Sequence, residues 1–307
     1  MKFAEQPLLI FDGACGTNLQ LMTISADDWG GCEGCNEILN LSAPHHIEQL
    51  HRSMLDAGAM VVETNTFGAS RVVLGEYGLQ DKVKEINLRA VEIARRAIGN
   101  RGDRYVAGSI GPGTKLPSLG HISVADLAAA TAEQVDALLE AGVDCLIIET
   151  CQDLLQTKTA LIVVFEKLAA AGSDLPVLAS VTIEQQGTML VGTDIAAVVA
   201  TLEPFPLFSL GLNCATGPQD MMSHVTYLSQ HWPHRISVIP NQGLPEVVNG
   251  ETCYPLSPGD YAEQMYRFVI EQGVSIVGGC CGTSPQHIAA LASKLGGVQP
   301  KQREVSA

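Results

Sequence analysis

The sequence has few positive charges and lacks a long apolar run. Its 307 residues include 18 lysines and arginines against 33 aspartates and glutamates, so the formal net charge is −15. A charge of that sign repels phosphate backbones, so we expect no nucleic-acid partner, although the acidity can equally serve solubility alone. The longest purely apolar stretches, such as Ala160 to Phe165, are too short to cross a bilayer, so no membrane partner is expected.

A secretory signal is also missing from the first residues. Residues 1–12 contain one lysine, a glutamate and a proline before a short apolar segment, without the cationic start and cleavage site of an export signal. We therefore expect a cytoplasmic protein. In a reducing compartment the nine cysteines are expected to be buried thiols or metal ligands rather than disulfides.

Eight short apolar segments rich in β-forming residues follow one another along the chain. They are continuous apolar runs rather than strict alternations, as expected for strands covered on both faces. The predicted strands are Leu8–Asp12, Met60–Asn65, Tyr105–Ile110, Cys145–Thr150, Val177–Ile183, Leu207–Cys214, Ile236–Pro240 and Ser275–Cys280. A stretch of helical spacing follows each: His46–Ala57, Lys82–Ile98, Ala125–Ala141, Leu154–Ala171, Asp194–Leu202, Gln219–His231, Gly259–Gln272 and Pro285–Leu295.

This alternation predicts an α/β fold, a single (β/α)8 TIM barrel over residues 1–298. About 150 residues per domain would suggest two domains, but such barrels take about 250 residues as one unit, and eight strands close them. A doubly wound open sheet is the alternative, although no Gly-x-Gly-x-x-Gly fingerprint follows the first strand. The long connection 14–44 is expected to fold over the barrel mouth, and the polar tail 299–307 to be frayed.

Barrel enzymes carry their sites on the segments that follow the strands, and unusual residues gather there in this sequence. The adjacent pair Cys280-Cys281 is the sharpest signal. Neighbouring side chains of a strand point to opposite faces, so the pair can bind one ion only where the backbone turns, which the surrounding glycines allow. Cys214 ends the sixth predicted strand, and barrel closure can bring it towards the eighth.

Three thiolates suit a tetrahedral zinc ion with one open position, as in a catalytic rather than a structural site. The alternative is three small buried hydrophobic residues, a role that cysteine often has. Asn241 could cap a turn or supply a neutral oxygen to the fourth position of the metal. Cys32-x-x-Cys35 has the spacing of a metal-binding pair without a second pair, so it could be redox-active, bind a second metal or be incidental.

Two acids, Asp12 and Glu149, end the first and fourth predicted strands. Carboxylates there can hold a substrate ammonium group, and the backbone amides of Gly13, Gly16 and Thr17 belong to a loop that can bind a carboxylate. The alternative for each acid is a helix cap or a salt bridge on the rim. None of the eight histidines ends a predicted strand, which weakens any acid–base mechanism centred on histidine.

With these residues the chain resembles the zinc-dependent homocysteine S-methyltransferases, and among them the N-terminal homocysteine-binding barrel of cobalamin-dependent methionine synthases. The resemblance covers nearly the whole chain. It rests on six motifs: Asp12-Gly-x-x-Gly-Thr17, Gly34-Cys-Asn-Glu-Ile-Leu-Asn40, Glu63-Thr-Asn-Thr-Phe67, Gly211-Leu-Asn-Cys-Ala-Thr-Gly-Pro218, Pro240-Asn-x-Gly-Leu-Pro245 and Gly278-Gly-Cys-Cys-Gly-Thr283. Two positions depart from the family pattern: Cys15 replaces a methionine, and Gln242 replaces a small residue.

The resemblance implies that Cys214, Cys280 and Cys281 bind Zn²⁺, with Asn241 in the fourth position when substrate is absent. It implies that Asp12, Glu149 and the loop 13–17 hold the amino acid end of homocysteine. The expected reaction gives methionine, with methylcobalamin as the donor on a partner module and a folate-binding module beside it, in cis or in trans. Family members that use S-methylmethionine or betaine directly provide the alternative.

Two other classes of function compete with a thiol methyltransferase. A phosphate-handling barrel enzyme could use the glycine-rich segment after the eighth strand, but that does not explain three thiols. A non-enzymatic zinc or redox module explains the thiols but not the acids of the rim. In the favoured mechanism the metal favours the substrate thiolate, which is the nucleophilic form of a thiol.

Overall fold

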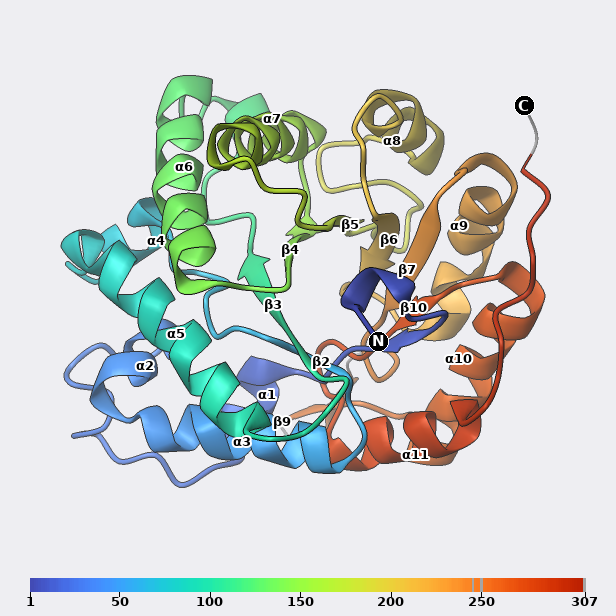
Figure 1. Ribbon diagram of the computed structural model, residues 1–307, viewed down its shortest axis with the longest axis horizontal. Coiled ribbons are helices and arrows are strands. Elements are labelled where there is room, and N and C mark those ends of the chain that lie inside the picture. The colour runs from blue at the N-terminus through green and yellow to red at the C-terminus, as the bar shows by residue number, and fades with distance from the viewer. Residues whose placement is uncertain (245, 249–250, 306–307) are drawn as a thin grey trace.

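Eight parallel strands form a barrel in the computed structural model, which describes residues 1–244, 246–248 and 251–305. The strand order is β1-β10-β7-β6-β5-β4-β3-β2, and a parallel bridge between Phe11 and Val61 joins the first and last strands. The helices surround the strands (Figure 1). The predicted (β/α)8 TIM barrel is therefore confirmed.

The barrel strands are mostly shorter than predicted, because polar residues near several carboxyl ends leave the ladder. Their bounds are Leu9–Ile10 (β1), Val61–Glu63 (β2), Tyr105–Ile110 (β3), Cys145–Cys151 (β4), Val177–Val181 (β5), Ser209–Asn213 (β6), Arg235–Ile239 (β7) and Ile276–Val277 (β10). Asp12, Cys214 and Cys280 thus follow their strands instead of ending them. Glu149 lies within β4, beside an irregularity in its pairing with β5.

The eight predicted helices are present within one or two residues of their expected bounds. They are Pro44–Asp56 (α3), Val83–Ile98 (α5), Val124–Ala141 (α6), Leu154–Ala171 (α7), Ile195–Leu202 (α8), Pro218–His231 (α9), Pro258–Gln272 (α10) and Pro285–Leu295 (α11). Side chains at the N-caps of α6, α7, α8 and α10 accept backbone N–H groups, and glycines in the left-handed region end α6, α7 and α10. Local capping therefore sets several of these boundaries.

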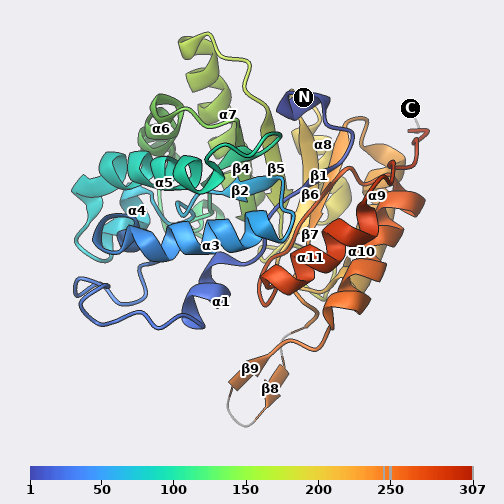
Figure 2. The same cartoon turned by 60° about the horizontal axis from the view of Figure 1, so that its bottom comes forward.

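Within the described residues, three further α-helices, several short 3-10 helices and an antiparallel hairpin were not predicted. The α-helices are Cys15–Gln20 (α1), Leu39–Ser42 (α2) and Arg71–Gly75 (α4), and the hairpin joins Glu246–Val248 (β8) to Glu251–Cys253 (β9). In Figure 2, α1 and the hairpin lie at one end of the barrel and both termini at the other. Pro245, the last residue of one sequence motif, lies outside the described residues.

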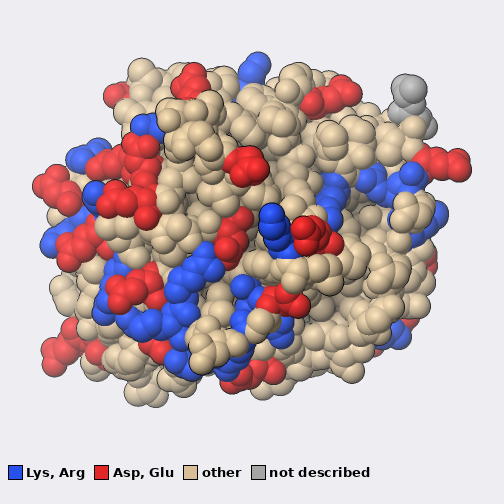
Figure 3. All heavy atoms as spheres, in the orientation of Figure 1, with Lys and Arg blue, Asp and Glu red and all other residues tan. Residues whose placement is uncertain are grey.

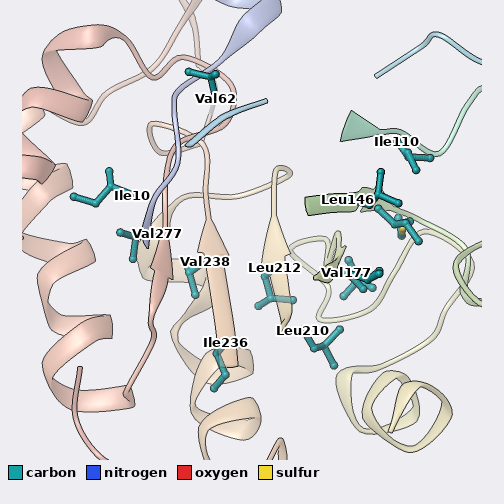
Figure 4. Close-up of a cluster of buried hydrophobic side chains, with 14 of the residues drawn as sticks. Ile10, Val62, Ile110, Leu146, Val177, Leu210, Leu212, Ile236, Val238 and Val277 are labelled. Carbon is teal, nitrogen blue, oxygen red and sulfur yellow. The ribbon is translucent and has the colours of Figure 1, made fainter. Parts of the chain in front are cut away.

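The side chains of each strand alternate between two hydrophobic layers. Leu9, Phe11 and Ile147 point into the barrel, whereas Ile10 and Ile148 pack under the surrounding helices. Figure 4 shows the helix-facing layer with residues from most strands of the barrel. Because both faces of every strand are buried, the strands read as continuous apolar runs in the sequence.

The polar tail does not fray over its first residues, contrary to the prediction. The Lys301 backbone N–H donates to Val269 O at 3.0 Å, and the Arg303 guanidinium donates to Trp232 O at 2.7 Å and to His234 O. These contacts hold residues 299–303 against α9 and α10. The tail thereby lies at the amino-terminal end of the barrel, away from the segments that follow the strands.

The surface shown in Figure 3 mixes charges of both signs over the region of α3 to α5. There Glu48 bonds Arg52 at 2.7 Å and Arg96 at 3.0 Å. Charges of both signs are therefore mixed on this face, although the chain as a whole has a net negative charge. Across 1–244, 246–248 and 251–305, the structure contains no helix with both the length and the apolar character that a membrane span requires.

Candidate functional site

A cavity of about 260 Å³ opens at the carboxyl ends of the barrel strands. Residues at or near the carboxyl ends of β1, β2, β3, β4, β6, β7 and β10 line it, together with part of α3. Residues 14–17 and 36–37 of the long connection contribute to the wall, so that connection does fold over the mouth. A larger hollow of about 580 Å³ lies beside the tail at the amino-terminal end, where barrel enzymes do not place their chemistry.

The three predicted zinc ligands meet at one edge of the cavity. The Sγ atoms of Cys214, Cys280 and Cys281 all lie within 4.8 Å of one another, and those of Cys214 and Cys281 are 3.9 Å apart. All three are free thiols. Cys214 and the pair Cys280-Cys281, which begins 66 positions further along the sequence, are therefore neighbours in space, as barrel closure predicted.

The end of β7 holds the two cysteine loops together. In the sheet β7 lies between β6 and β10. The Cys214 N–H donates to Ile239 O on one side, and the Cys280 N–H donates to Pro240 O at 2.8 Å on the other. The Gln242 N–H then donates to Cys281 O at 2.9 Å. One strand end thus fixes the spacing between the two loops.

Backbone geometry at this edge is unusual. Thr150, Cys214 and Ala215 have positive φ angles of 55°, 62° and 55°, a conformation that costs energy for residues other than glycine. Gly282, next to the cysteine pair, also has a positive φ, and a Cβ there would collide with the ring of Tyr254. The turn that lets adjacent cysteines face one centre therefore requires this glycine.

The three thiols have the spacing of a metal site. With bonds of about 2.3 Å to sulfur, a tetrahedral zinc ion places its sulfur ligands about 3.8 Å apart, close to the 3.9 Å between Cys214 and Cys281. Asn241 lies in the loop after β7, between the two cysteine loops. Its side-chain oxygen is buried and has no hydrogen-bond partner in the described structure. The donor set and this oxygen both fit a zinc ion.

Without a cation the three thiols share their charge unequally. Hydrogen bonds from Cys214 and Cys280 lower the pKa of Cys281 to about 3. Hydrogen bonds with Cys214 and Cys281 raise the pKa of Cys280 well above its usual value. Three thiolates so close together need a positive charge between them.

Three carboxyl groups converge in the cavity: the predicted Asp12 and Glu149, and Glu63 of β2. One carboxylate oxygen of Asp12 accepts the Glu63 N–H at 3.1 Å. Burial raises the pKa of each carboxyl group, and the neighbouring acids raise those of Asp12 and Glu63 further. Lysine and arginine are absent from the residues that line the cavity in the described structure. Such a group of acids favours a cationic ligand.

The Glu149 carboxylate is held in place by three hydrogen bonds. Ser109 Oγ donates to it at 2.6 Å, and Thr150 Oγ1 and Asn213 Nδ2 each donate at 3.3 Å. Asn213 also accepts the Thr150 N–H at 2.9 Å through its side-chain oxygen. Ser109, Thr150 and Asn213 therefore position this acid, a role that the sequence analysis did not assign.

The loop after β1 borders the other side of the cavity. Gly13, Gly16 and Thr17, the predicted substrate residues of this loop, all line it. The Ala14 N–H is not free, because it donates to Thr283 Oγ1 at 3.1 Å. Thr17 Oγ1 accepts the Gly282 N–H at 3.1 Å, which ties this loop to the cysteine pair.

The two departures from the family pattern have local roles. The Cys15 thiol lines the cavity, yet it is outside the three-cysteine group and donates to Asn65 Oδ1 at 3.6 Å. The side chain of Gln242 donates to Leu256 O at 2.6 Å, which links the loop after β7 to the segment before α10. Cys35 is buried and its thiol donates to Glu37 at 3.7 Å; neither it nor Cys32 joins a metal-type group in the described structure.

Sequence reasoning also missed His51, which lies on the cavity wall in the middle of α3. The analysis considered only histidines at strand ends. The sequence gives no signal for which residues of a helix around the barrel reach the cavity.

Comparisons with known proteins agree with this geometry. A model of the family described as homocysteine S-methyltransferase matches residues 9–295. The methionine synthase of Mycobacterium tuberculosis (strain ATCC 25618 / H37Rv) is 44% identical over 306 residues, and that of Mycobacterium leprae (strain TN) is 45% identical over 299 residues. These matches cover 98% and 96% of this chain but only 26% and 25% of the two relatives.

Among solved structures, the metallated form of the homocysteine methyltransferase MmuM from Escherichia coli is similar over 94% of this chain and 97% of its own. Its TM-score is 0.74 and its sequence identity 26%. The oxidized form of the same protein gives the same values. The chain thus spans about a quarter of the methionine synthases that it matches, and nearly all of this shorter relative.

Proposed function

The chain belongs to the homocysteine S-methyltransferase family, and from this premise we propose that it binds one zinc ion and methylates the sulfur of homocysteine. Cys214, Cys280 and Cys281 would hold the ion, with the Asn241 oxygen beside them when no substrate is bound. The observation that carries the proposal is the convergence of three thiols, within 4.8 Å, on a cavity that also contains three acids.

Bound at these thiols, zinc would supply the charge that favours the thiolate form of homocysteine, whose free thiol is mostly protonated at neutral pH. The acids Asp12, Glu63 and Glu149 attract the ammonium group, and the loop 13–17 receives the carboxylate. The thiol proton leaves to solvent. The thiolate sulfur then forms a bond to the methyl carbon as the bond between that carbon and the donor breaks.

We propose methylcobalamin as the donor, carried on a cobalamin-binding module that acts with a folate-binding module, in cis or in trans. The support is the similarity to methionine synthases, of whose length this chain spans about a quarter. A second candidate is direct use of S-methylmethionine or betaine. It is favoured by the likeness to a homocysteine methyltransferase of about this size.

Homocysteine binding to the zinc-loaded protein is expected to release protons near neutral pH. The thiol loses its proton on binding, and the ammonium group favours ionised forms of acids whose pKa burial has raised, so both effects act in the same direction. Calorimetry in buffers of different ionisation enthalpy measures the number released, expected to be roughly one or more per site. The zinc-free protein serves as the control. Equally tight binding by that protein, or binding with no proton released, contradicts the proposal.

Substitution of the acids should weaken substrate binding without loss of metal. Asp12→Asn and Glu149→Gln each remove a charge-assisted contact to the ammonium group, and the homocysteine dissociation constant should rise roughly 10- to 100-fold. Isothermal titration and zinc analysis measure the two quantities. Glu85→Gln is the matched control, since Glu85 lies on the outer surface of α5 and pairs with Lys82. If both cavity variants bound homocysteine with unchanged affinity, Asp12 and Glu149 would have a structural role only.

A further inference from the structure

A second group of metal-binding side chains lies where the long connection 14–44 meets the start of α3. The ligand atoms of Asp28, His45 and His46 all lie within 4.8 Å of one another. Asp28 belongs to the connection, and the two histidines occupy the second and third positions of α3. None of the three is among the described residues that line the cavity, so this group is separate from the three cysteines.

Local contacts set the positions of these side chains. The Ser25 N–H and Oγ donate to Asp28 Oδ2 at 3.0 and 2.7 Å, which fixes the carboxylate. Adjacent residues of a helix ordinarily point in different directions, yet the ring centroids of His45 and His46 are 4.1 Å apart. His46 is buried and His45 is exposed, so the group has one ordered side and one side that solvent reaches.

The separation of Asp28 and His46 fits two ligands of one ion better than a direct ion pair. The carboxylate Oδ2 and the ring Nε2 are 3.5 Å apart. A charge-assisted N–H···O bond is shorter, about 2.7–2.9 Å. A tetrahedral zinc ion with bonds of about 2.1 Å to nitrogen and oxygen holds these ligands roughly 3.4 Å apart. The observed spacing is therefore close to that of a coordinated pair.

The charge of the surrounding sequence favours a cation at this place. Residues 3–51 contain seven aspartates and glutamates and neither lysine nor arginine. Two imidazoles and one carboxylate suit a transition-metal ion such as Zn²⁺, whereas Mg²⁺ and Ca²⁺ prefer sites built from oxygen alone. Three protein ligands leave a further position of the ion for water, on the side where His45 is exposed.

We propose that Asp28, His45 and His46 bind a second divalent transition-metal ion, for which Zn²⁺ is the probe. This site goes beyond the proposed function and does not depend on it. Its ligands carry one negative charge against three from the cysteines, so it binds zinc more weakly and fills second. An ion here joins residues 25–28 to α3, and so holds the connection whose residues 14–17 and 36–37 form part of the cavity wall.

Zinc titration of the full chain tests this site. Calorimetry on protein loaded with one equivalent of zinc should show a second, weaker equivalent, for which excess Mg²⁺ does not compete. Asp28→Asn, His45→Ala and His46→Phe should each weaken the second binding event roughly 10- to 100-fold or more, since even residues that only hydrogen-bond to metal ligands contribute that much. Cys280→Ser should lose the first event and keep the second, so failures of the two zinc sites are distinguishable.

Two further measurements locate the ion. His121→Ala is the matched control, because His121 is exposed and belongs to neither group of metal-binding side chains in the described structure. It should leave both events unchanged. The second equivalent should slow amide hydrogen exchange in residues 25–28 of the unaltered protein but not of His45→Ala, whose exposed position makes the substitution compatible with the fold. The inference is overturned if no second equivalent binds, if all three variants retain it, if His121→Ala loses it equally, or if exchange in residues 25–28 does not change.

Discussion

Cys280→Ser and Cys281→Ser should each abolish zinc binding at stoichiometric levels and lower the rate of methionine formation by about a thousandfold or more. A metal that stabilises a developing or bound anion contributes several kcal/mol, and each 1.36 kcal/mol changes a rate tenfold. Serine lacks the soft, readily ionised donor that zinc prefers. Cys214→Ser should behave in the same way, because its Sγ is 3.9 Å from that of Cys281. Zinc analysis and a methionine assay measure the two effects.

Cys32→Ser is the matched control for these variants. It removes a partly exposed thiol outside the three-cysteine group, so zinc content and activity should stay at the level of the unaltered protein. Full zinc retention by both Cys280→Ser and Cys281→Ser would place the metal elsewhere. Cys32 and Cys35 would then be the next residues to substitute.

The choice of methyl donor should produce the second large effect. With zinc and homocysteine, the chain alone is expected to demethylate free methylcobalamin slowly. Adding a cobalamin-binding module should raise the rate at least about a hundredfold, since positioning one reactant against another contributes effective molarities far above those in solution. Methyltetrahydrofolate alone should give no methionine. Methionine formation and the absorbance of the corrin follow the reaction.

The second candidate donor predicts the reverse pattern. Efficient turnover with S-methylmethionine or betaine, and none with methylcobalamin in the presence of the module, would remove the cobalamin assignment. A cobalamin-binding module whose surface charges are reversed tests whether any acceleration needs a specific complex. The thiol-methylating site itself would be unaffected by either result, because it depends on the cysteines and acids of this chain.

The barrel could be predicted from the sequence because its signals are local. Apolar runs buried on both faces, helix-capping residues and glycines after helices each depend on neighbours in the sequence. The ends of the strands were harder to predict. Hydrogen bonds to the partner strand decide whether a residue such as Asp12 or Cys214 belongs to a strand. The hairpin of β8 and β9 was missed, although the dipeptide Asn249-Gly250 is a sequence signal that favours β-hairpins.

The site was predicted only in part, for a related reason. Cys214 and the pair Cys280-Cys281 stand out because of residue type and position after strands. Glu63 was part of a quoted motif but received no role. Its place in the site becomes apparent only beside two acids, distant in the sequence, that face the same cavity. His51 was missed because its place on the cavity wall depends on how α3 packs against the barrel. The docking of Arg303 on backbone carbonyls of α9 and the segment after it depends likewise on tertiary contacts, with no local pattern.

The hydrogen bonds on either side of the end of β7 make the three thiols a preorganised chelate. The loops that carry Cys214 and Cys280 are each joined to Ile239 or Pro240 by backbone bonds that need no metal. Little conformational entropy then remains to be lost when an ion enters. The affinity of the three thiols for the ion should therefore depend on the geometry at the end of β7, a strand that contributes no thiol. Ion affinity could therefore be tuned by substitutions at Gln242 or its neighbours while every sulfur ligand stays in place.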